Sequence, residues 1–121
     1  MLNFSNVVAL FQDLPSVLGV LIVDADGLAL AGSLKSKAEM ESVSPVMHTL
    51  LNDIFKHFTA LGETINQVCF VQDSRVIIAQ PVYDVILVVC SEKTGLQSLQ
   101  PRFSSAVSLL QRITAPDFLN T

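Results

Sequence analysis

The chain has few of the residues that bind nucleic acids and few that crosslink extracellular proteins. It contains seven lysines and arginines in 121 residues, no tryptophan, and two cysteines, Cys69 and Cys90. A phosphate-binding surface needs clustered cations, and here they are scattered, so we expect no nucleic-acid partner. The spacing of the cysteines permits a disulfide. Because both lie in apolar stretches, the pattern favours two buried free thiols.

Long hydrophobic runs are also absent. The longest apolar stretches have about seven residues, whereas a membrane-spanning helix needs about 20. The amino-terminal stretch MLNFSNVV lacks the cationic start of a secretory signal. These absences predict a cytoplasmic protein without membrane insertion.

No motif for catalysis or metal binding is present. His48 and His57 are expected on one helix but on opposite sides of it, so they cannot share a metal. Asp24 and Asp26 lie in a predicted hairpin turn, where aspartate is a common structural residue. The chain has no phosphate loop, no nucleophile elbow and no C-x-x-C pair. Arg75, beside a turn, is interpreted as a solvated residue. We therefore predict no enzyme, no cofactor and no metal.

The composition is unusually apolar for a small domain. Half of the residues are hydrophobic, the mean hydropathy is +0.53, and charged residues make up 15%. The length suits one domain, residues 1–121. Because a small domain has much surface to cover, the surplus apolar residues must crowd the core or lie at an interface.

The stretch from Leu14 to Ser33 predicts a β-hairpin. Residues 17–23 form an apolar, β-branched run typical of a strand that is buried on both faces. The turn sequence Asp-Ala-Asp-Gly at residues 24–27 follows, and residues 28–31 resume an apolar strand. Such a hairpin needs a covering layer on each face.

Three amphipathic stretches predict helices over residues 3–14, 40–61 and 96–113. Asn3 or Ser5 can cap the first helix. The middle helix either begins at Ser44 and Pro45, or begins near Ser36 and is kinked at the proline. In the last helix, Pro101 is tolerable if the helix begins two or three residues before it.

Three further strands are predicted between the last two helices. Residues 64–72 mix polar and apolar side chains and suit an edge strand, residues 75–82 are apolar on both faces, and residues 85–90 should be central. The fold class is therefore α+β, a three-layer sandwich around a five-stranded antiparallel sheet. The element order is helix, strand, strand, helix, three strands, helix. We place the first and last helices on one face and the middle helix on the other.

The middle helix is apolar over about half of its circumference, more than one sheet can cover. Val46 lies on one flank of this arc and Phe55 on the other. The excess predicts a second packing partner for this helix.

Two stretches resemble the roadblock/dynein light chain family. They are LPSVLGVLIVDADGLALAGS, with its Leu-Pro helix end and Asp-Gly hairpin, and RVIIAQPVYDVILVVCSEKTGLQSL. The resemblance covers about residues 4–113. It implies a dimer in which the middle helices pack together and edge strands pair into one continuous sheet. The interface residues predicted on this basis are Val46, Met47, Leu50, Ile54, Phe55, Val68 and Phe70.

The resemblance also implies a function. Bacterial relatives of the MglB type bind a small Ras-like GTPase and stimulate GTP hydrolysis, and eukaryotic relatives are scaffolds. We therefore expect a non-enzymatic dimer that regulates such a GTPase in trans and supplies no arginine finger. The alternative is a scaffold subunit, as a homodimer or with a roadblock paralogue. A small-molecule sensor is a third and less favoured interpretation, because the apolar strands suggest a filled core.

The polar side of the middle helix is the predicted GTPase-facing surface. Its residues fall within about 80° of one another on a helix, and they are Glu41, His48, Asn52 and Lys56. Only eight residues follow Ile113, so we expect functions carried by long carboxy-terminal extensions to be lacking.

Overall fold

The computed structural model describes residues 3–34 and 37–115, with the side chains of residues 37–44 excepted. The elements are α1 (Phe4–Ala9), β1 (Val17–Val23), β2 (Ala29–Ser33), α2 (Lys37–Ala60), β3 (Val68–Val71), β4 (Arg75–Val82), β5 (Val85–Glu92), a 3₁₀ turn η1 (Lys93–Gly95) and α3 (Leu96–Thr114).

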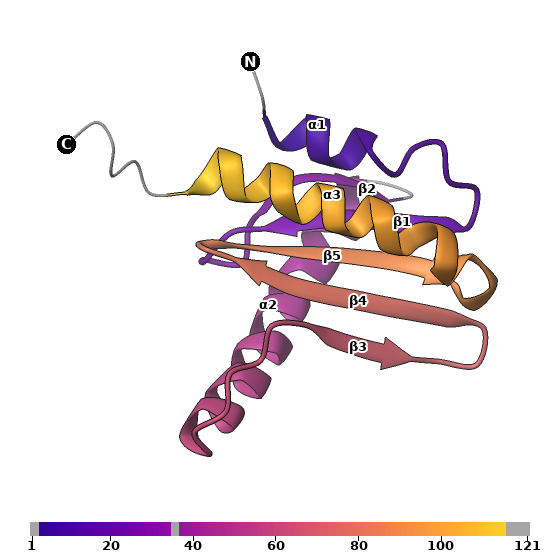
Figure 1. Ribbon diagram of the computed structural model, residues 1–121. Helices are drawn as coiled ribbons and strands as arrows, with labels where there is room; N and C mark the ends of the chain where they lie inside the picture. Colours follow the sequence, from indigo (N-terminus) through magenta and orange to yellow (C-terminus); the bar gives the residue numbers. More distant parts are fainter. Residues whose placement is uncertain (1–2, 35–36, 116–121) are drawn as a thin grey trace.

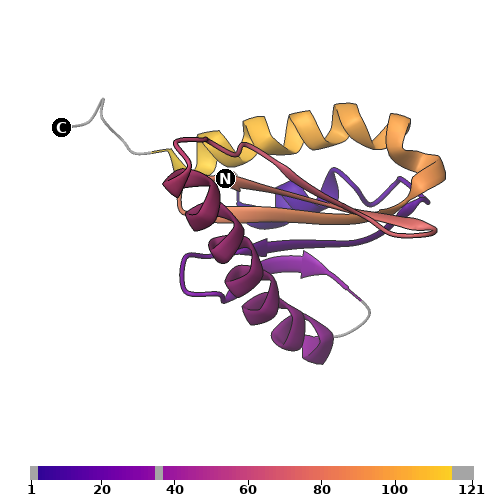
Figure 2. The same cartoon turned by 90° about the horizontal axis from the view of Figure 1, so that it is seen from below.

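The strands form one five-stranded sheet in the order β2-β1-β5-β4-β3, and each neighbouring pair is antiparallel. The predicted fold class is confirmed, with β5 central and β3 at an edge. Helices α1 and α3 lie on one face of the sheet and α2 lies on the other (Figures 1 and 2).

The core is divided by the sheet into two unequal parts. The larger part packs α1 and α3 against the sheet and includes Val7, Phe11, Leu99, Phe103 and Leu110. The smaller part lies under α2 and is built around Leu51. Alternate residues of β1 serve the two sides, because successive side chains of a strand point to opposite faces.

The β1–β2 turn forms as the sequence predicts. The Asp24 carboxylate oxygen Oδ1 accepts hydrogen bonds from the backbone N–H groups of Asp26 and Leu28, both at 2.9 Å. Gly27 has a φ of 84°, which glycine adopts without a steric penalty. Asp24 is therefore a structural turn residue.

Two prolines lie inside helices, and the structure supports one of the two sequence expectations about them. Pro45 lies inside α2, so the second of the two predicted starts, near Ser36, is supported by a helix that begins at Lys37. Helix α3 begins at Leu96, five residues before Pro101, so the prediction of two or three residues is wrong. Pro101 leaves the Gln97 carbonyl without its helical donor, and both residues are exposed, so water can bond to that oxygen.

Two other predicted elements are shorter than expected. Helix α1 ends at Ala9, and turns of the i to i−3 type continue to Leu14. Asn3 caps this helix in a reciprocal capping box with Asn6. Strand β3 covers Val68–Val71 rather than residues 64–72, because the chain first returns from the end of α2 to the sheet edge (Figure 1).

One ion pair ties α3 to the turn after α1. The Arg102 guanidinium donates to both carboxylate oxygens of Asp13, at 2.6 and 2.8 Å, and to the Leu10 carbonyl at 2.7 Å. This bidentate hydrogen bonding lowers the pKa of Asp13 below its ordinary value. The pair therefore stabilises the fold only while Asp13 is ionised.

The Asp13→Asn variant tests this linkage. A carboxyl with a lowered folded-state pKa stabilises the fold above its unfolded pKa, and this stability is lost as pH falls through the folded pKa. We expect Asp13→Asn to be less stable than the wild type at about pH 7, and this difference to shrink at about pH 2, because the Asp13 carboxyl takes up a proton as pH falls. Urea unfolding at the two pH values measures this difference. Asp84→Asn controls for the loss of one negative charge, and an equal pH dependence of stability in wild type and Asp13→Asn would contradict the assignment.

Candidate interaction surface

Helix α2 is attached to the sheet by few of its apolar side chains. Over residues 45–60, Leu51 alone is fully buried. Val46 and Leu50 are 64% and 44% exposed, and Leu61, directly after the helix, is 75% exposed. At 100° per residue these three side chains share one side of the helix. This group, the outer stripe of α2, is an apolar surface without cover in a single copy.

Two of the seven predicted interface residues belong to the outer stripe of α2, and the other five are partly buried. Met47, Ile54 and Phe55 are half-buried, and Met47 and Phe55 pack on the smaller core. On β3, Val68 and Phe70 also pack on that core. These residues form the margin between the smaller core and solvent, next to the outer stripe.

Strand β3 is an edge strand with little protection. Its sequence, Val-Cys-Phe-Val, contains no proline and no charge. Cys69 is exposed and Val71 is 68% exposed. Edge strands of native proteins usually carry proline or charged residues, or are covered by another element. Strand β3 has no proline and no charge, so it is open to pairing with another strand.

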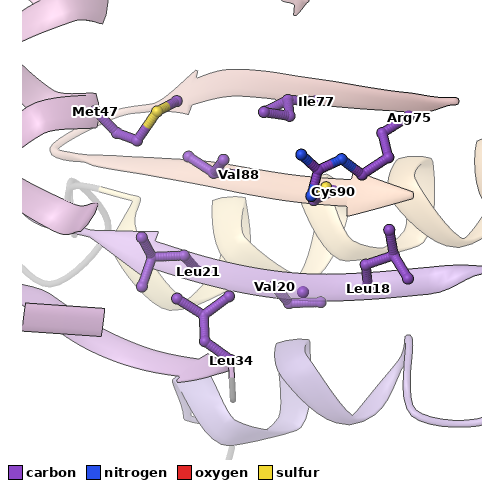
Figure 3. A pocket seen from close by; sticks show the side chains of 10 residues that line it. Leu18, Val20, Leu21, Leu34, Met47, Arg75, Ile77, Val88 and Cys90 are labelled. Carbon is purple, nitrogen blue, oxygen red and sulfur yellow. The ribbon is translucent and has the colours of Figure 1, made fainter. Parts of the chain in front are cut away.

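Helix α2 crosses only one end of its face of the sheet (Figure 1). The side chains below it are Leu21, Val23, Ala79 and Val88. Beyond them lies a groove of about 400 Å³ over β1, β5 and β4, which we call the sheet groove. It is lined by Leu18, Gly19, Val20, Leu21, Leu34, Met47, Arg75, Ile77, Val88 and Cys90 (Figure 3).

The floor of the sheet groove depends on Gly19. A Cβ at this position would lie 2.5 Å from Leu34 Cδ2, so a larger residue would displace Leu34. Gly19 pairs with Cys90 across the strands, and Cys90 pairs with Ile77. The three positions therefore form one row across the sheet.

Arg75 supplies the only cationic side chain among the lining residues. Its side chain reaches from β4 toward Cys90 on β5 (Figure 3). Within the described residues, the ion pair found is that of Arg102 with Asp13, so the Arg75 guanidinium has no carboxylate partner there. The groove is thus an apolar surface with one cation.

Burial raises the pKa of the Cys90 thiol, and the nearby Arg75 charge opposes the rise without cancelling it. Cys90 is therefore less reactive than an ordinary thiol. Cys69 and Cys90 are both free, but only Cys90 is partly buried, so the expectation that both are buried is wrong for Cys69.

The predicted GTPase-facing residues divide into two groups. Asn52 and Lys56 are exposed on α2, whereas His48 is half-buried and packs on the hairpin turn at Gly27. The Glu41 side chain lies outside the described residues. In the described part of the chain, no group of three His, Cys, Asp or Glu residues is arranged to hold a metal.

Sequence reasoning missed the sheet groove. The alternation of β4 and β5 places Arg75, Ile77 and Cys90 on one face, but it does not give the direction in which α2 crosses the sheet. That direction leaves the groove open.

Thiol reactivity tests the environment of Cys90. Only the thiolate attacks a disulfide reagent, so a raised pKa and partial burial slow the reaction. We expect the Cys69→Ala variant, which retains Cys90, to react at least about tenfold more slowly at neutral pH than Cys90→Ala, which retains Cys69. Stopped-flow absorbance measures both rates. Equal rates, or faster reaction of Cys90, would show that the assignment is wrong.

The exposed apolar stripe of α2 and the open edge strand β3 are thus features of a five-stranded α+β fold. In that part of the chain, no helix is long and apolar enough to cross a membrane. The model of the Roadblock/LC7 domain matches residues 4–91, and the chain belongs to this family.

Solved structures share the fold at low identity. Myxococcus xanthus MglB is 17% identical with a TM-score of 0.81, covering 91% of this chain and 93% of that one. The gliding protein MglB of Thermus thermophilus is 15% identical with a TM-score of 0.76, covering 91% and 87%. A structure described as MglB with tetrameric arrangement is 14% identical with a TM-score of 0.77, covering 91% and 86%. No curated protein sequence matches this chain.

Proposed function

We propose that this chain forms a dimer through α2 and β3, and that the dimer binds a small Ras-like GTPase and regulates its GTP hydrolysis. Roadblock/LC7 family membership supports a regulatory or adaptor role related to small GTPases. The observation that carries the proposal is the outer stripe of α2, an apolar surface that a single copy leaves open.

Two exposed features of the single copy favour a dimer, because one partner can cover both of them. The outer stripe exposes Val46, Leu50 and Leu61 to water, and β3 exposes an unprotected edge. Pairing β3 with β3 extends the sheet and brings the two α2 helices together. An obligate interface of this kind buries about 2,000 Å² or more in total. The partner is a second copy of this chain or a roadblock paralogue.

The GTPase binds the polar side of α2 in this proposal. Asn52 and Lys56 are exposed there, next to His48 and the helical position of Glu41. A two-fold dimer presents one joint surface, so one GTPase binds two copies. The regulator acts by positioning groups of the GTPase itself, since phosphoryl transfer depends mainly on orientation and charge stabilisation. It prefers the GTP-bound form, because the γ-phosphate orders the loops that it contacts.

A scaffold without effect on hydrolysis is the second candidate. It is favoured by one comparison, since a neighbouring MglB structure is described with a tetrameric arrangement, which points to assembly. Among the described side chains of α2, the polar side carries a single exposed lysine or arginine, Lys56. A GTPase assay separates the two candidates.

Leu50→Asp tests the dimer. Placing a charge in the outer stripe should break the association, because an unpaired carboxylate would be buried between the helices. The control is Leu30→Asp on β2, since Leu30 is 41% exposed and Leu50 is 44% exposed. Size-exclusion chromatography with light scattering should show a dimer for the wild type and Leu30→Asp, and a 13.1 kDa monomer for Leu50→Asp. A wild-type monomer at micromolar concentration would contradict the proposal.

Lys56→Glu tests the GTPase-facing surface. Reversing a charge at an interface weakens association, here by about tenfold. Arg112→Glu, at an exposed position on α3 on the opposite face of the sheet, is the matched control. Single-turnover GTP hydrolysis by a cognate GTPase should be accelerated by the wild type and Arg112→Glu, and less by Lys56→Glu at subsaturating concentration. Binding that is indifferent to nucleotide and produces no acceleration would favour the scaffold.

A further inference from the structure

We infer that the sheet groove receives the last turn of α2 from a second copy of this chain, and that Arg75 pairs there with the second copy's Glu63. The inference rests on the dimer of the proposed function. It goes further, because it gives the groove an occupant and Arg75 a partner.

The occupant is suggested by the part of α2 that projects from the molecule. The end of α2 extends past β3, beyond the edge of the sheet (Figure 1). Phe58 and Leu61 at this end are 43% and 75% exposed. The helix is closed by hydrogen bonds from the N–H groups of Gly62 and Glu63 to the carbonyls of Thr59 and Phe58, both at 2.9 Å. The projecting end is therefore a formed turn that exposes apolar side chains to solvent.

The receiving surface lies on the same face of the sheet at the opposite strand ends. Helix α2 covers the end of the sheet near the β4–β5 turn, where Val23 and Ala79 pack beneath it. The sheet groove occupies the other end, at the beginning of β4 and the end of β5. Its apolar floor includes Ile77 and Cys90 (Figure 3). One copy thus has a projecting turn at one end and an open groove at the other.

A two-fold axis brings these two features together. Antiparallel pairing of β3 with β3 requires an axis that passes between the two β3 strands, perpendicular to the sheet, and this axis keeps both α2 helices on the same face. The axis also exchanges the two strand ends. The projecting turn of each copy is therefore carried across the shared edge onto the uncovered end of the other copy. Because the interface is isologous, every contact occurs twice.

The charges at the two features are complementary. Arg75 lies at the groove without a carboxylate partner among the described residues, although Glu92 is its neighbour across the strands. Glu63 is exposed and follows directly after the projecting turn. The carboxyl end of a helix also attracts a cation, because its last carbonyl groups carry partial negative charge. Arg75 therefore meets two favourable partners when a second copy is seated.

A charge-swap cycle tests the pairing. Arg75→Glu and Glu63→Arg should each raise the dimer dissociation constant by about tenfold, and the double variant should return it to within about threefold of the wild type. Sedimentation equilibrium on the full chain measures the constant. All substituted side chains belong to exposed residues, and circular dichroism checks that each variant folds. Arg112→Glu, at an exposed position on α3, controls for the change in net charge.

The outcomes separate this inference from the proposed function. If Leu50→Asp breaks the dimer while the charge-swap variants leave its dissociation constant unchanged, the inferred position of the α2 turn is wrong and the dimer stands. Weakening by both single variants without rescue in the double variant also overturns the pairing. Rescue supports the pairing even where no acceleration of a GTPase is found.

A small anionic amphiphile is the other occupant that an apolar groove with one cation can hold. Decanoate is a suitable probe, since it joins a carboxylate to an acyl chain. If the α2 turn fills the groove, calorimetry should detect no binding of decanoate to the wild-type dimer. Arg75-dependent binding of decanoate to an intact dimer would overturn the inference.

Discussion

One helix cannot cover a five-stranded sheet, and the structure depends on this constraint. A helix is about 10 Å wide, and five strands spaced by about 4.8 Å span about 19 Å, so each face needs about two helices. The α1 and α3 face has two, and its core is complete. The α2 face has one helix, with Leu51 as the fully buried side chain of its described part. The sheet groove and the outer stripe of α2 are both exposed, because one helix of the described chain covers only part of this face.

The α2 face and the β3 edge have features of a surface that another protein can cover. Within the described residues, exposed apolar side chains and an unpaired strand edge lie next to each other there. In the proposed dimer, a second copy supplies both a helix and a strand, which completes the face and the sheet together. The polar side of α2, with Asn52 and Lys56, is the surface that our proposal assigns to the GTPase.

Much of this fold could be predicted from the sequence, because strong local patterns agree with the final packing. The Asp24 to Gly27 turn, the apolar run of β5 and the stripe of α3 each identify their element. The excess apolar arc of α2 also predicts an uncovered surface. Element ends were less predictable, because Pro45 and Pro101 lie inside helices, where proline more often marks a helix end. The sheet groove could not be predicted, since it depends on the direction of α2 across the sheet and not on any local pattern around Arg75.

The central claim is that the α2 face and the β3 edge are completed by a second copy. Amide hydrogen exchange tests it most directly, because the molecule contains its own reference. Strands β2 and β3 are both edges of the sheet in one copy. In a dimer paired through β3, the amides of Val68–Val71 should exchange more slowly than those of β2, and dilution below the dissociation constant should remove this difference. Exchange of β3 that is as fast as that of β2 at every protein concentration would contradict the account.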